Sequence, residues 1–128
     1  MSVLATVADR AAADSPLWAG ALLPAAPSAP ARFAGRCPDR HLLGVEMIYE
    51  GYLLHYGRSR LFSQADPDLA LLTGDYLYAA GLREICATGD LAAVASLAGL
   101  ISRCARNQGD RAAETDAALW DETVASLG

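Results

Sequence analysis

LLGVEMIYEGYLLHYGRSR at residues 42–60 and TGDYLYAAGL at residues 73–82 are the two stretches that decide the fold. In both, apolar residues recur every three to four positions, which is the period of an α-helix. Asp39 is a candidate cap for the first stretch, and Pro67, directly after an aspartate, is a typical helix start for the second. We therefore expect two central helices, over about residues 38–62 and 67–87.

Weaker helical signals lie on both sides of this pair. Ser2 and Ser15-Pro16 are helix starts near the N-terminus, and Asp90 opens a helix with a regular apolar stripe that ends near Asn107, ahead of a last helix. No segment alternates apolar and polar residues as a strand does. We expect an all-α protein, a small helical bundle of about four main helices plus short N-terminal helical pieces.

The chain has 128 residues, which is enough for the core of one domain. Prolines at positions 24, 27, 30 and 38 indicate an extended arm after the first short helices. We predict that residues 1–36 hold the short N-terminal helices and the Ala/Pro-rich arm, and that residues 37–128 form the helical bundle domain.

Composition limits the classes of partner and compartment. All ten basic residues are arginine, and the formal net charge of −5 argues against nucleic acid as a partner. Cys37, Cys86 and Cys104 are odd in number and widely spaced, unlike a disulfide framework or a zinc site, so we expect a reduced, cytoplasmic setting. The N-terminus lacks the features of a secretory signal. No apolar run reaches the roughly 20 residues that cross a bilayer, so we expect membrane association only through a partner.

Residues 41–106 resemble the middle helices of the trans-polyprenyl diphosphate synthase family. The most specific match is Gly74-Asp75-Tyr76-Leu77, because the family carries Gly-Asp-x-Leu at this point. The resemblance implies the central helices of the isoprenoid synthase fold, in which an aspartate-rich motif holds magnesium and an allylic diphosphate. Here Tyr56, Gly57 and Arg60 stand where those carboxylates are expected, and the sequence contains no Asp-Asp pair. The resemblance therefore implies a chain that is not an enzyme, with no catalytic residue, metal or cofactor.

The two central stretches carry all five tyrosines of the chain. An aromatic ring with a polar tip suits core packing, a protein interface or an apolar groove. In the resembled family these helices line the tunnel for the prenyl chain and also form the dimer interface, so the three roles stay open. The candidate residues for an interface or groove are Tyr49, Tyr52, Tyr56, Tyr76 and Tyr78.

Charged candidates lie along the first central stretch and at its end. Arg58 and Arg60 are candidates for contact with a diphosphate or another anion; a salt-bridge or interface role and a plain surface position are the alternatives. Glu46 and Glu50 are one turn apart, which is the spacing of paired carboxylates in metal-binding bundles. No Glu-x-x-His motif accompanies them. We therefore expect them to form a solvated or arginine-paired face.

His55 and Asp75 are expected to be structural polar residues. His55 lies on an apolar side of its helix, where a lone histidine is usually hydrogen-bonded within the core. The other histidine, His41, is too far along the chain for helical ligand spacing. For Asp75 we expect burial or half-burial, with hydrogen-bond donors or an arginine as partners.

Two functions are consistent with these patterns. The first is a non-catalytic helical interaction subunit, dimeric or bound to a larger complex such as a prenyl diphosphate synthase. It would be similar to the non-catalytic small subunits of heterodimeric long-chain prenyl synthases. The second is a carrier or sensor that binds an isoprenoid or quinone tail, which requires an internal cavity of about 300 Å³ or more.

Overall fold

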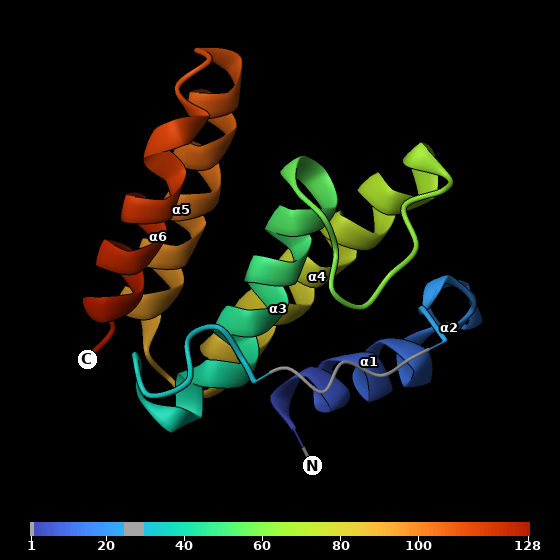
Figure 1. The fold of residues 1–128 in the computed structure, drawn as a ribbon. Coiled ribbons are helices and arrows are strands. Elements are labelled where there is room, and N and C mark those ends of the chain that lie inside the picture. Colours follow the sequence, from blue (N-terminus) through green and yellow to red (C-terminus); the bar gives the residue numbers. More distant parts are fainter. Residues whose placement is uncertain (1, 25–29) are drawn as a thin grey trace.

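A computed structural model of the chain describes residues 2–24 and 30–128, and these residues form a small all-α bundle (Figure 1). Within the described ranges there is no β-strand, and a single isolated β-bridge joins Leu22 to Phe62. The helical elements are α1 (Val3–Asp14), α2 (Pro16–Ala21), α3 (Asp39–Tyr56), α4 (Pro67–Ala87), α5 (Leu91–Gly109), the 3₁₀ turn η1 (Ala113–Thr115) and α6 (Asp116–Ala125).

The helices α3 and α4 form the centre of the molecule and run antiparallel in close contact. Glycines permit the close approach: a Cβ atom placed on Gly44 would lie 2.9 Å from the carbonyl oxygen of Gly81, and one placed on Gly51 would lie 2.9 Å from that of Gly74. Real Cβ atoms essentially never lie this close to another heavy atom. The two helix backbones therefore touch at two points, each point being a pair of glycines.

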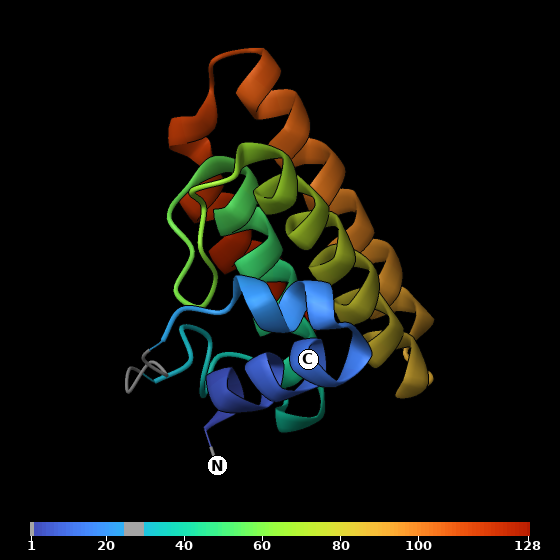
Figure 2. The ribbon, with the colours of Figure 1, turned by 90° about the vertical axis from the view of Figure 1, so that its right-hand side faces the viewer.

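The helices α1 and α2 lie on one side of the α3–α4 pair, and α5 and α6 lie on the other (Figures 1 and 2). Each side holds an apolar cluster. Leu4 of α1, Met47 of α3 and Leu77 of α4 belong to the first cluster, against which α2 also packs. Ile48 of α3 and Trp120 of α6 belong to the second, which the helices α4 and α5 complete. Because α3 and α4 contribute side chains to both clusters, each of these helices is buried on more than one side.

Side-chain caps explain where most helices begin. Ser2 accepts a hydrogen bond from the amide of Ala5 at 3.1 Å, and Asp66 accepts two from the first turn of α4. Asp90 caps α5 in the same way. These starts confirm the predicted positions. Asp39 was expected to cap α3, but it is the first residue of that helix, and Pro38 precedes it without a side-chain cap.

The predicted end of α3 at Phe62 is wrong, since the helix ends at Tyr56. Gly57 follows with a non-helical backbone, and residues 57–63 form a loop that turns back along α3. Ser59, Arg60 and Phe62 therefore lie in this loop and not on the helix that was predicted to include them.

The predicted arm is only partly visible in the described residues, because residues 25–29 lie outside them. Residues 32–36 form turns instead of an extended strand-like segment, and Phe33 in this part is completely buried in the second cluster. The division of the chain at residue 36 stays a prediction. Across the described parts of the chain, the helices are too short or too polar for one to span a membrane.

Candidate functional site

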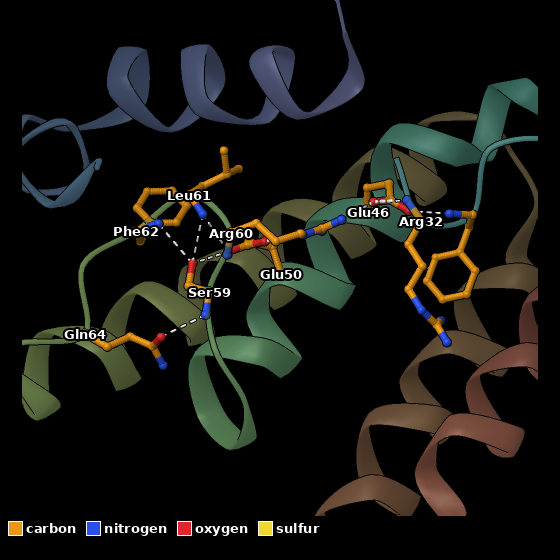
Figure 3. Close-up of polar contacts among 9 residues, drawn as sticks. Arg32, Glu46, Glu50, Ser59, Arg60, Leu61, Phe62 and Gln64 are labelled. Carbon is orange, nitrogen blue, oxygen red and sulfur yellow. Dashed lines mark hydrogen bonds and ion pairs between the residues drawn. The ribbon is translucent and has the colours of Figure 1, made fainter. Parts of the chain in front are cut away.

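The most unusual feature of the molecule is a pair of completely buried glutamates on α3 (Figure 3). Glu46 and Glu50 are one helical turn apart, and both face Arg60, which lies in the loop after α3. The Arg60 Nε atom donates to Glu50 Oε1 at 2.9 Å, and its Nη1 atom donates to Glu46 Oε1 at 2.8 Å. The expected pairing with arginine is therefore present, whereas the expected solvated face is not.

Glu50 also binds the backbone of the loop that follows α3. Its Oε2 atom accepts from the amide of Arg60 at 3.0 Å, from that of Leu61 at 3.4 Å and from the Ser59 hydroxyl. Ser59 in turn accepts from the amide of Phe62 at 2.9 Å. These bonds replace helical hydrogen bonds and explain why the chain leaves the helix after Tyr56.

Glu46 holds the segment that precedes α3. Its two carboxylate oxygens accept from the amides of Arg32 at 3.2 Å and Phe33 at 2.9 Å. Burial acts to lower the pKa of Arg60, but the hydrogen bonds and attraction of Glu46 and Glu50 outweigh it and raise that pKa. Arg60 is thus held charged, and the cluster joins both segments that flank α3.

An aromatic group lies beside this cluster, between α3 and α6. The rings of Tyr49 and Trp120 meet edge to face at 5.0 Å, and Phe33 lies within 5.6 Å of both. The guanidinium carbon of Arg32 lies 4.5 Å from the centre of the Phe33 ring and 4.9 Å from that of Tyr49. Such cation–π contacts fix the guanidinium over the rings.

Asp116, at the start of α6, is buried with three hydrogen-bond donors. Tyr52 donates from its hydroxyl at 2.7 Å, Asn107 at 2.9 Å and Gln108 at 3.2 Å. Burial, together with the bond to Asp116, raises the pKa of the Tyr52 hydroxyl, so Tyr52 stays neutral. Burial also raises the pKa of the Cys104 thiol to about 12, with Asp116 as the next cause.

The five candidate tyrosines do not lie together in the structure. Tyr49, Tyr52 and Tyr78 pack against the second cluster, and Tyr56, which is more exposed, meets Tyr52 at 5.4 Å. Tyr76 lies on the other side of α4, where its ring stacks on Trp18 at 4.9 Å and its hydroxyl donates to Asp14 at 2.5 Å.

Each histidine is close to an aspartate of another helix or cap. The Nε2 atom of His55 lies 3.0 Å from Asp75 Oδ1, but Asp75 is 68% exposed, so its expected burial is wrong. His41 is completely buried, and its Nε2 atom lies 3.0 Å from Oδ2 of Asp90, the cap of α5. The two pairs connect α3 to α4 and to α5.

Replacing Asp90 by asparagine is expected to make the stability of the protein less sensitive to acid. The amide of Ala93 and then His41 hold the pKa of Asp90 below its ordinary value of 3.8. A carboxyl with a lowered folded pKa stabilises above its unfolded pKa, about 3.9, and this contribution is lost as the pH falls through the folded value. Urea unfolding at pH 7 and pH 3 measures this.

The difference in stability between wild type and Asp90→Asn should therefore narrow at pH 3. Asp110→Asn changes an exposed aspartate and serves as the control. A difference that stays the same at both pH values would show that the Asp90 contacts do not favour its charged form.

Arg58 is exposed and has no ion pair among the described residues, whereas the guanidinium of Arg60 is already paired with Glu46 and Glu50. Within the same residues no three His, Cys, Asp or Glu side chains lie together as metal ligands. Arg32, Asp116 and Trp120 were not among the candidate residues, and they lie in the aromatic region. The sequence feature that could have indicated this region was Phe33, because it is a large aromatic residue inside a stretch of Ala, Pro, Gly and Arg.

No family model, curated protein or solved structure matches this chain. The relation to polyprenyl diphosphate synthases thus depends on the residues quoted above and stays a prediction.

Proposed function

We propose that this chain is a non-catalytic helical interaction subunit on a polyprenyl-synthase-like scaffold. The partner is a second copy or a larger complex such as a prenyl diphosphate synthase. The chemistry of the buried polar residues supports a structural role: Glu46, Glu50 and Arg60 bind one another and the loops next to α3. Groups that are engaged in this way hold the fold and are not free to act on a substrate.

One surface feature carries the proposal, and we call it the α2–α4 patch: Leu17, Trp18, Leu72 and Tyr76. The Trp18 and Tyr76 rings stack at 4.9 Å. Leu72 lies one turn before Tyr76 on the same face of α4, and Leu17 is the residue before Trp18 in α2; the two leucines are 54% and 50% exposed. Large apolar side chains gathered at one surface are typical of protein contacts, and aromatic residues are enriched there.

Replacing Leu72 by aspartate is expected to weaken association about tenfold or more. Burying one leucine contributes about 1.5–3 kcal/mol, and a charge in its place would also have to lose its water. The effect is measured by sedimentation of the purified chain across a concentration series. Pull-down of tagged chain from its native cells, with mass spectrometry of proteins and lipids, tests for a different partner.

Leu91→Asp is the matched control, because Leu91 is 69% exposed and lies at the start of α5, away from the patch. Wild type and Leu91→Asp should associate equally. If all three proteins sediment as the same monomer and no stoichiometric partner is recovered, the proposed function is wrong.

A second candidate, the carrier of an isoprenoid or quinone tail, is favoured by a hollow between α3 and α6 of about 270 Å³. This volume is just below the roughly 300 Å³ at which ligand pockets usually begin. The hollow suits a ring better than a long chain, and the carrier is therefore the weaker of the two proposals.

A further inference from the structure

The hollow between α3 and α6 has aromatic walls and a cationic edge. It is lined by Tyr49 and Tyr52 of α3, by Asp116 and Trp120 of α6, and by Arg32 from the segment before α3. A cavity of about 150 Å³ binds benzene, so about 270 Å³ accepts a substituted single ring or a small double ring. The aromatic lining favours a planar ligand that stacks on or against these rings.

Arg32 presents an unused hydrogen-bond donor in this region. Its backbone amide is held by Glu46, and its guanidinium lies over the rings of Phe33 and Tyr49, beside the hollow. The Nη2 atom lies 3.4 Å from Asp121 Oδ1. The Nη1 atom is buried and has no hydrogen-bond acceptor among the residues that the structure describes. Such a donor is costly to leave unpaired, and a ligand oxygen would pair it.

The charged residues around the hollow decide whether the ligand oxygen should be neutral or negatively charged. The lining holds one arginine against the carboxylates of Asp116 and Glu114, and Asp121 already offsets part of the charge of Arg32. A ligand carboxylate would meet repulsion from these groups. A neutral carbonyl oxygen accepts the same hydrogen bond without this repulsion. Asp116 already accepts from three donors and needs none from a ligand.

We propose that the hollow binds a small, neutral, planar ring that carries a carbonyl oxygen, as a quinone ring does. The ring packs among Tyr49, Tyr52 and Trp120, and the guanidinium of Arg32 turns so that Nη1, which is buried without the ligand, donates to the carbonyl oxygen. This proposal is independent of the interaction role, because the hollow and the α2–α4 patch lie on opposite sides of the α3–α4 pair.

The test uses tetramethyl-1,4-benzoquinone, whose fully substituted ring resists addition of thiols. Trp18→Phe leaves Trp120 as the one tryptophan of the chain, and quenching of its fluorescence reports binding. We expect saturable quenching in this background. Adding Arg32→Gln should weaken binding about tenfold or more, since a hydrogen bond from a charged donor is lost.

Arg36→Gln is the matched control, because Arg36 also pairs with Asp121, at 3.1 Å, but does not line the hollow. It should leave binding unchanged. Ala117→Leu provides a second variant that does not depend on Arg32: Ala117 is exposed and lines the hollow, so a larger side chain fills space without disturbing the core. It should also weaken binding.

Three results would overturn the proposal. Quenching that rises linearly without saturation would mean collision and not binding. Equal affinities of the Arg32→Gln and Arg36→Gln proteins would remove the assigned hydrogen bond. Benzoate binding as tightly as the quinone would contradict the preference for a neutral oxygen. None of these results bears on association through Leu72, which the sedimentation experiment tests separately.

Discussion

Replacing Arg60 by methionine is expected to lower the free energy of unfolding by about 3–5 kcal/mol. Glu46 and Glu50 are completely buried, and Arg60 is the cation that contacts both of them. Without it, two carboxylates would remain in the interior with only backbone amides and a hydroxyl as partners. The free energy of unfolding of a whole domain is usually about 5–15 kcal/mol, so this substitution would remove a large fraction of the stability. Urea unfolding followed by circular dichroism measures it.

Arg58→Met is the matched control, since Arg58 is two residues away and carries the same charge, but its side chain is exposed. It should change stability by less than about 0.5 kcal/mol. Adding Glu50→Gln to Arg60→Met should restore part of the loss, because one of the two unpaired charges is then gone. A loss below about 1 kcal/mol for Arg60→Met would show that water or other residues compensate the buried carboxylates.

Replacing Gly81 by alanine is expected to destabilise the protein by up to about 2 kcal/mol. The new Cβ atom would lie 2.6 Å from Ile48 Cγ1 and 2.7 Å from the carbonyl oxygen of Gly44, so α3 and α4 would have to separate. Overpacking costs about 1–3 kcal/mol. Alanine favours helix by about 1 kcal/mol, which offsets only part of this. The same unfolding assay measures the change.

Gly99→Ala is the control that separates packing from helix propensity. Gly99 lies inside α5, and a Cβ atom there would have no neighbour within 4 Å. This variant should gain up to about 1 kcal/mol, because only the propensity changes. If Gly81→Ala is also stabilising, the backbones of α3 and α4 are not in the close contact described.

Helix starts could be predicted from the sequence, because their signals are local. Ser2, Asp66 and Asp90 accept bonds from amides two or three residues later, and this spacing is readable in the chain. The end of α3 could not be predicted in the same way. It depends on the bonds from residues 59–61 to Glu50, which form only when the loop has turned back.

The candidate site was predicted only in part for the same reason. The spacing of Glu46 and Glu50 places them on one face, and the arginine pairing follows from composition. Their burial depends on Arg32 and Phe33, which are more than ten residues upstream. The pair of His55 and Asp75 joins two helices and has no sequence signal. Gly44 and Gly51 are seven residues apart, as are Gly74 and Gly81, and this spacing is a sequence signal of close helix packing. Of these four glycines, only Gly74 belongs to the Gly-Asp-x-Leu match.

The position of the α3–α4 pair between two apolar clusters bears on how the molecule responds to change. A perturbation in one cluster can reach the other only by displacing two helices whose backbones already touch. Energetic coupling between distant sites requires shared partners or a common displacement. Substitutions confined to α1 and α2 should therefore add to those confined to α5 and α6, whereas a substitution that moves α3 against α4 should affect both clusters.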